Sequence, residues 1–341
     1  MTSQPVPLLS VRDLEVTFKG HRKLLSKGPA ATVRAVDGVS FEVYPGETLS
    51  LVGESGCGKS TTARGVMRLV QPAAGQVTLD GHEIMSLKGN ALRTARKKMQ
   101  MVFQDPYSSL DPSMLIGAAI AEPLDAHTKL SRSEKADRVA EVLTQVGMDP
   151  DYANRYPHEF SGGQRQRLTI ARAISVNPKL LILDEAVSAL DVSTQNQILE
   201  LLEKLKAELG LAYLFIAHDL SVVRHIYDRV AVMYMGRIVE YGTVDAVFEN
   251  PSHPYTHALR SAVPIPSPRV QRHRPRLVLK GDPPDPANLP QGCRFAGRCP
   301  AVMDICRKVD PPAFPTPAGA VAACHLLDPA AEPERRVATT V

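Results

Sequence analysis

The stretch GESGCGKS, residues Gly53 to Ser60, fits the pattern G-x-x-x-x-G-K-[ST]. It directly follows the apolar run TLSLV and opens a segment predicted to be helical through Arg68. Glycines let a backbone curl so that successive N–H groups point at phosphate oxygens, and a helix start adds partial positive charge. The strand, loop and helix together predict a phosphate-binding loop in a nucleotide-binding α/β domain.

Each residue type in this loop has an expected task. Lys59 is expected to reach the β- and γ-phosphates of the nucleotide, and the Ser60 hydroxyl is expected to bind Mg²⁺. Cys57 stands at a variable position of the pattern, where a small side chain is enough. The residues of this segment predicted to bind the nucleotide are Gly53, Ser55, Gly56, Cys57, Gly58, Lys59, Ser60 and Thr61.

Short apolar runs alternate with helical patterns on both sides of the loop. Thr48–Val52 and Leu180–Leu183 are predicted to be buried parallel strands, because they are brief, continuous and apolar. Residues 131–146 are predicted to form a helix that starts with a capping box, and a second helix is predicted to end at Gly210. A strand at residues 213–217 follows. This alternation predicts a parallel sheet with helices.

Three further segments indicate what the bound nucleotide is used for. LLILDE ends a predicted strand with Asp184, suited to Mg²⁺, and Glu185, suited to orient and deprotonate an attacking water. FSGGQRQR, residues 160–167, precedes an amphipathic helix and is a second anion-receptive helix start. His218 follows the run YLFIA, at a strand end that faces the ligand in such folds. These residues predict hydrolysis of a nucleoside triphosphate.

Composition excludes several other classes of protein. The chain has 341 residues, 44% hydrophobic and 22% charged, and a formal net charge of only +4, which gives no argument for nucleic-acid binding. The basic segment at residues 269–280 lacks interleaved aromatic side chains, so a solvated linker near anionic headgroups is expected instead. Without a signal peptide or a membrane-length apolar run, the chain is expected to be cytoplasmic.

The C-terminal part of the chain differs in composition from the rest. Fifteen of the 28 prolines lie in the last 78 residues, so neither long helices nor a regular sheet is expected there. We therefore predict a nucleotide-binding domain at residues 1–263 and an irregular extension at residues 264–341. Four of the five cysteines lie in this extension, namely Cys293, Cys299, Cys306 and Cys324.

The motifs GESGCGKS, VFQDP with Gln104, SGGQ, LLILDE, SALD and His218 occur in the order found in ATP-binding-cassette (ABC) ATPases, which residues 8–263 resemble. This resemblance implies a RecA-like P-loop NTPase core with an antiparallel β subdomain and an inserted helical subdomain at about residues 105–175. The family usually has Pro after the catalytic Glu, where this chain has Ala186. That departure removes no functional group.

The resemblance also implies roles for individual residues and for a partner ATPase. Two subunits close head to tail around two ATP molecules, so that each ATP lies between one P-loop and the partner's signature segment, here Ser161, Gly162, Gly163 and Gln164. Phe18 would stack on adenine, and Asp191 would communicate across the interface. Gln104 would bind Mg²⁺ together with Ser60 and Asp184 and contact the transport subunits. Glu185 and His218 would be catalytic.

Finer features resemble one branch of this family. ENPSHPYTHALRSAVP, residues 249–264, and the cysteine-bearing tail resemble dipeptide and oligopeptide importers, and the insertion at residues 19–41 is similar to the second, F-type ATPase of such importers. The resemblance implies a second ATPase subunit, two transmembrane permease subunits and an extracytoplasmic peptide-binding protein as partners, at the cytoplasmic face of the membrane. Import of nickel or another small solute is the alternative. A soluble ABC ATPase of DNA repair or of the ribosome is less favoured, because the chain has one cassette and no long heptad insertion.

The four cysteines of the extension are separated by five, six and seventeen residues and lack paired C-x-x-C knuckles. In a reducing compartment such a cluster favours metal binding over disulfides, and a proline-rich segment with little core would gain stability from a metal. Spacing alone leaves zinc and iron–sulfur open. The resemblance to the peptide importers implies a [4Fe–4S] cluster with a structural role, with His325 as a neighbour rather than a ligand.

Overall fold

The computed structural model describes residues 6–19, 32–218, 228–263, 277 and 279–330. Most of the basic segment at residues 269–280 and residues 20–31 of the insertion at 19–41 lie outside the described residues. The strands are β1 (Leu9–Lys19), β2 (Thr32–Val43), β3 (Thr48–Val52), β4 (Ala74–Leu79), β5 (His82–Glu83), β6 (Met99–Val102), β7 (Leu180–Asp184), β8 (Ala212–Ala217), β9 (Arg229–Tyr234), β10 (Arg237–Thr243), β11 (Ala313–Pro315) and β12 (Val321–Ala323). The helices of the described part are α1 (Lys59–Val66), α2 (Gly89–Lys98), α3 (Pro106–Ser109), α4 (Ile116–His127), α5 (Arg132–Gln145), α6 (Gly162–Ile174), α7 (Val192–Leu209) and α8 (Pro254–Ala262), with short 3₁₀ or π turns between them.

The chain forms two compact units. The first consists of Met1–Ser10, Glu42–Thr48 and Val77–Ile216, and the second of Val11–Phe41, Leu49–Gln76 and Ala217–Val341. In the described parts of the chain, no helix has the length and apolar character needed to cross a bilayer.

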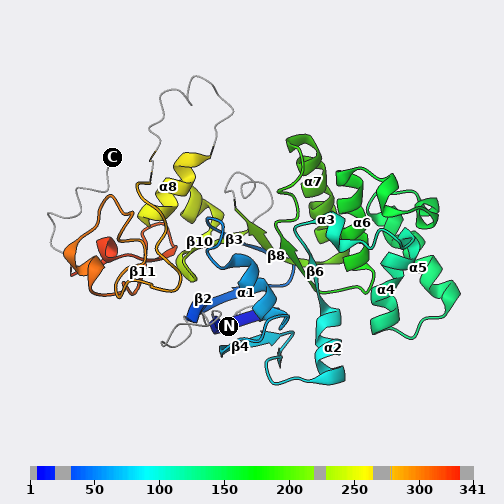
Figure 1. Ribbon diagram of the computed structural model, residues 1–341, viewed down its shortest axis with the longest axis horizontal. Coiled ribbons are helices and arrows are strands. Elements are labelled where there is room, and N and C mark those ends of the chain that lie inside the picture. Colours follow the sequence, from blue (N-terminus) through cyan, green and yellow to red (C-terminus); the bar gives the residue numbers. More distant parts are fainter. Residues whose placement is uncertain (1–5, 20–31, 219–227, 264–276, 278, 331–341) are drawn as a thin grey trace, which may run out of the picture. The chain divides into compact units, whose positions relative to one another are not determined.

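The first unit contains parallel strands in the order β8-β7-β6. All residues of β7 and β8 are buried, as expected for a central parallel strand. A cluster of helices, α3 to α6, belongs to the same unit (Figure 1). The predicted α/β fold with an inserted helical part is therefore confirmed.

Local sequence signals explain where three helices of this unit begin or end. Ser131 and Glu134 form the predicted capping box of α5, with the Ser131 N–H donating to a Glu134 carboxylate oxygen at 2.7 Å. α7 ends at Gly210, which adopts a left-handed φ of 64°. The helix after the SGGQ segment begins earlier than its apolar pattern indicates, at Gly162, because Ser161 and Gln164 form a second capping box.

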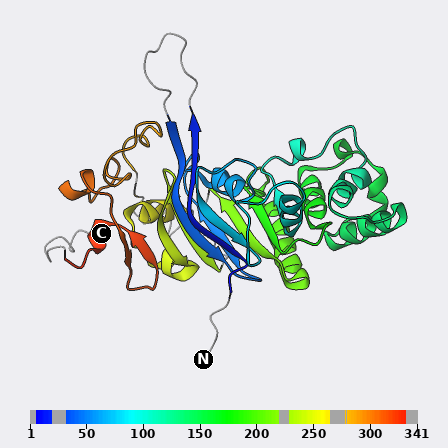
Figure 2. The ribbon, with the colours of Figure 1, turned by 90° about the horizontal axis from the view of Figure 1, so that it is seen from below.

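The second unit contains strands in the order β11-β12-β10-β9-β3. β3 and β9 are parallel, whereas β10 pairs with β9 and with β12 in antiparallel fashion. β1 and β2 are long neighbouring strands of a second sheet (Figure 2). Residues 279–330 of the extension are mostly irregular, as predicted. The expectation that it contains no regular sheet is wrong, because two three-residue strands, β11 and β12, join the sheet at β10.

Candidate active site

The phosphate-binding loop in the second unit depends on glycines for close backbone contacts. A Cβ atom on Gly53 would lie 2.2 Å from the Met233 carbonyl oxygen, and one on Gly58 would lie 2.3 Å from the Ala35 carbonyl oxygen. Gly58 also has a φ of 107°, which L side chains rarely adopt. The neighbouring strands therefore fix the loop's curvature, and only glycine fits at these two positions.

Lys59 is folded over the loop. Its side chain is 3% exposed, and its Nζ donates to the carbonyl oxygens of Gly53 at 2.7 Å and Glu54 at 3.0 Å. α1 starts at Lys59, and its N-cap, Gly58, provides no side-chain hydrogen bond. The arrangement places an ammonium group and a helix start in one loop, which suits a polyphosphate. The predicted helix ends at Val66 rather than at Arg68.

The first unit holds the predicted water-activating residue. Glu185 follows β7, and the Gln104 side-chain amide donates to its Oε2 at 2.7 Å. The Glu185 N–H donates to the Ile216 carbonyl at 3.1 Å, and its carbonyl accepts from the Ser188 hydroxyl at 2.9 Å. Glu185 has a φ of 49°, a conformation unusual for a residue with a Cβ. The Glu185 carboxylate is thus held by Gln104, and its backbone is held in a strained conformation. Such strain is common at functional sites.

The remaining predicted residues lie in both units. Asp184 is 2% exposed at the end of β7, in the first unit. In the second unit, His218 is exposed directly after β8, and Phe18 is 42% exposed on β1. The hydrogen bond between Gln104 and Glu185 thus brings two of the predicted site residues together in the first unit.

The signature segment and the SALD segment pack against each other in the first unit. Asp191 caps α7 by accepting from the Thr194 N–H at 3.0 Å and from its hydroxyl at 2.7 Å. A hydrogen bond from the Ser193 hydroxyl, together with these two from Thr194, holds the pKa of the Asp191 carboxyl well below its usual range. A Cβ atom on Gly163 would lie 2.3 Å from Thr194 Cγ2, so the glycine permits this packing.

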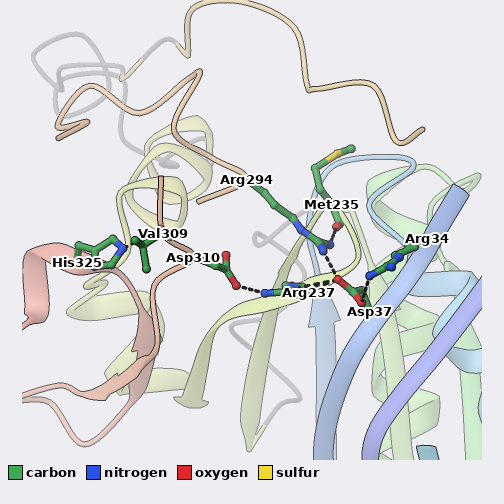
Figure 3. Close-up of polar contacts among 8 residues, drawn as sticks. All are labelled: Arg34, Asp37, Met235, Arg237, Arg294, Val309, Asp310 and His325. Atoms are coloured by element: carbon green, nitrogen blue, oxygen red, sulfur yellow. Dashed lines mark hydrogen bonds and ion pairs between the residues drawn. The ribbon is translucent and has the colours of Figure 1, made fainter. Parts of the chain in front are cut away.

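The extension is anchored on the second unit by a buried carboxylate. Asp37 forms ion pairs with Arg237 at 3.0 Å, with Arg34 at 3.7 Å and with Arg294 of the extension (Figure 3). Burial alone would raise the pKa of Asp37, but Arg294 and Arg237 together bring it below its ordinary value. The anchor thus consists of one carboxylate shared by three guanidinium groups, one of them from the extension.

The four extension cysteines are free thiols in one neighbourhood. Burial, together with repulsion from the other three thiolates, raises the pKa of Cys324 to about 12, and burial is the main cause that raises the pKa of Cys293 to about 11. Within the described residues, however, no group of three or more Cys, His, Asp and Glu side chains is arranged to hold a metal ion. The Nε2 of His325 lies 3.0 Å from the Val309 carbonyl oxygen (Figure 3).

One set of contacts was not predicted from the sequence. Arg298 of the extension pairs with the carboxylate of Glu54, and the Tyr255 hydroxyl accepts from the Glu54 N–H at 2.9 Å. Glu54 is a variable position of the loop pattern, and its partners lie 201 and 244 residues further along the chain. The sequence shows only that an arginine, Arg298, precedes Cys299, and this does not indicate which carboxylate it contacts.

Two family models and several known proteins are similar to this chain over most of its length. Residues 36–188 match the family described as "ABC transporter", and residues 239–306 match "Oligopeptide/dipeptide transporter, C-terminal region". The chain is 55% identical to a probable peptide ABC transporter ATP-binding protein of Sinorhizobium fredii, over 88% of this chain and 84% of that protein. It is 52% identical to the oligopeptide transport ATP-binding protein OppF of Escherichia coli, over 89% and 92% of the two chains.

A solved structure shares the fold. A dimeric ATP-binding cassette in a post-hydrolysis state, bound to ADP and phosphate, aligns with a TM-score of 0.61 at 28% identity. The alignment covers 69% of this chain and 98% of that one.

Proposed function

The chain belongs to the family of ATP-binding subunits of oligopeptide and dipeptide ABC importers, and from this premise we propose how its residues divide the work. It is the ATPase subunit of such an importer and couples ATP hydrolysis to import. The match of residues 239–306 to the transporter's C-terminal region carries the assignment to peptides. DNA-repair and ribosome-associated ATPases are thereby set aside.

The loop residues bind the phosphates of ATP in this proposal. The N–H groups of the loop and the Lys59 ammonium group contact the β- and γ-phosphates, supported by the burial of Lys59 and the curvature fixed by Gly53 and Gly58. Phe18 stacks on the adenine ring. Ser60, Asp184 and Gln104 would hold Mg²⁺, which would neutralise charge on the phosphates.

Glu185 orients the attacking water and accepts its proton, while His218 contacts the reacting end of the nucleotide. The hydrogen bond from Gln104 supports this role, because it fixes one oxygen of the Glu185 carboxylate. Ser161 to Gln164 contact the ATP of a second ATPase subunit. Asp191 communicates across the interface between the two subunits, and its hydrogen bond from the Thr194 N–H supports a fixed position for its carboxylate.

The partners follow from the family. We infer a second ATPase subunit of a different sequence, two permease subunits and an extracytoplasmic peptide-binding protein, with this chain at the cytoplasmic face of the membrane. Its 52% identity with OppF supports the F-type position in the ATPase pair.

The test is peptide uptake by the purified complex in lipid vesicles. ATP-dependent uptake of a labelled oligopeptide is expected with the native chain and is expected to be lost with Lys59→Ala. Uptake of nickel but of no peptide by the intact complex would overturn the peptide assignment and leave the ATPase assignment standing.

The [4Fe–4S] cluster stays a prediction. Its support is the convergence of four thiols in one neighbourhood of the extension, each able to serve as a sulfur ligand. Because ATP hydrolysis needs no redox step, we assign the cluster a structural role in the extension.

Anaerobic purification decides the cluster question. Brown protein with broad absorption near about 400 nm and about four irons per chain is expected, and Cys299→Ser should bleach it. Colourless anaerobic protein that contains one zinc per chain would contradict the cluster.

A further inference from the structure

Glu54 places a negative charge inside the loop that is proposed to bind phosphate. It is the residue after Gly53, and its side chain is 31% exposed. A free carboxylate at this position would repel the phosphates of a nucleotide over a few ångströms, where little water intervenes. A cation next to Glu54 would cancel this repulsion, and Arg298 of the extension provides one.

Arg298 holds the Glu54 carboxylate in a two-pronged contact. Its Nη1 donates to Glu54 Oε2 at 2.6 Å and its Nη2 to Oε1 at 3.0 Å. The Arg298 side chain is only 9% exposed, and its guanidinium carbon lies 6.0 Å from the centre of the Tyr234 ring. A partly buried, bidentate pair of this kind fixes both charge and geometry.

The backbone of Glu54 is held by two more contacts. Its N–H donates to the Tyr255 hydroxyl at 2.9 Å, and its carbonyl accepts from Lys59 Nζ at 3.0 Å. Glu54 is thus the point at which the extension, α8 and the phosphate-binding lysine meet.

An aromatic cluster keeps this arrangement rigid. Phe295, in the same loop of the extension as Arg298, is 1% exposed. Its ring centre lies 5.2 Å from that of Tyr234 and 5.4 Å from that of Tyr255. The extension therefore cannot shift Arg298 away from Glu54 without breaking a packed core.

We propose that Arg298 is a positioning residue of the ATP site, which neutralises Glu54 and so sets the affinity of the loop for nucleotide. The inference rests on the proposed binding of ATP phosphates by the loop. It gives the C-terminal extension a direct effect on the ATPase site, independent of any metal bound to the cysteines.

The test is the dissociation constant for Mg-ATP of the purified full-length chain, measured by isothermal titration calorimetry. Arg298→Gln is expected to weaken binding about tenfold, because it leaves the Glu54 charge uncompensated. Glu54→Gln combined with Arg298→Gln is expected to restore the constant to within about threefold of the native value, since no net charge then faces the phosphates.

Arg294→Gln is the matched control. Arg294 also lies in the extension next to a cysteine and is also 9% exposed, but it pairs with Asp37 and the Met235 carbonyl rather than with the Glu54 carboxylate (Figure 3). Asp37 keeps two other arginines in that variant, so the protein should fold. Its ATP dissociation constant is expected to stay within about twofold of the native value.

Each other outcome has a definite meaning. Equal weakening by Arg294→Gln and Arg298→Gln, or failure of the double variant to recover, would reduce the role of Arg298 to general stability and overturn the proposal. Unchanged affinity in Arg298→Gln overturns it too. If Arg298→Gln does not fold, Arg298→Lys replaces it and is expected to show an intermediate loss. Absence of ATP binding by the native chain would instead refute the proposed function.

Discussion

At the scale of single residues, the carboxylate of Glu185 is the group on which hydrolysis depends. Gln104 and a left-handed backbone hold it in place. Replacement by glutamine removes the base and leaves the phosphate contacts intact. We expect Glu185→Gln in the assembled complex to keep ATP affinity within about twofold and to lower turnover by ~10² or more.

The measurement is steady-state ATPase activity together with nucleotide binding. The control is Glu203→Gln, which changes an exposed carboxylate on α7 and should leave turnover unaltered. Near-native turnover in Glu185→Gln would contradict the assignment of Glu185 as the general base.

Asp37 makes the anchoring of the extension sensitive to acid. Its pKa is lowered in the folded protein, so it contributes stability above the unfolded pKa of about 3.9, and that contribution disappears as the pH falls through the lower folded value. Asp37→Asn is expected to cost about 2 kcal/mol of unfolding free energy at pH 7. The difference from native protein should shrink below about pH 4.

Chemical denaturation at a series of pH values measures this dependence. Asp310→Asn is the control, because Asp310 pairs with the same Arg237 but is 38% exposed, and solvent screening should keep its cost below about 1 kcal/mol. A cost for Asp37→Asn that does not vary between pH 7 and pH 3 would contradict the ion-pair explanation.

At the scale of elements, the start of α6 and the start of α7 are packed so closely that only glycine fits at position 163. Gly163→Ala would bring a methyl group to 2.3 Å from Thr194 Cγ2, a branched and stiff side chain. We expect a loss of about 1–3 kcal/mol in unfolding free energy.

Two further variants identify the cause. Thr194→Ser removes the clashing methyl group, keeps the hydroxyl bonded to Asp191 and should recover most of the loss. Gly162→Ala should cost less than Gly163→Ala, since its new methyl group would meet only Leu190, at 3.7 Å. Equal losses in the two alanine variants, measured by thermal or chemical unfolding, would rule out the Thr194 clash.

Elements with local determinants were predictable from the sequence, and contacts across long separations were not. The capping box of α5 and the end of α7 at Gly210 depend on residues within one turn, so their positions were predicted closely. The start of α6 was missed because its capping box lies outside the apolar stripe. Arg298 and Glu54 are 244 residues apart, and nothing in either segment specifies the other.

At the scale of the whole molecule, the chain presents its signature segment to a nucleotide that it does not itself bind, according to the proposal. The isolated chain is therefore expected to hydrolyse ATP slowly, with a specific activity that rises with protein concentration. Addition of the complementary ATPase and the permease subunits should raise it by at least ~10-fold. Fast turnover that is independent of concentration in the lone chain would contradict a shared site.

The pairing of β12 with β10 has a consequence for solubility. Glu240 and Tyr241 on β10 are in register with Ala322 and Val321, and Gly242 lets Ala320 approach closely. The extension thus covers hydrogen-bonding groups that would otherwise form an open sheet edge, where a strand of another molecule can add. A chain that ends at residue 263 would expose this edge of β10. We expect such a chain to self-associate even though its phosphate-binding loop is intact. The extension is therefore also expected to reduce aggregation.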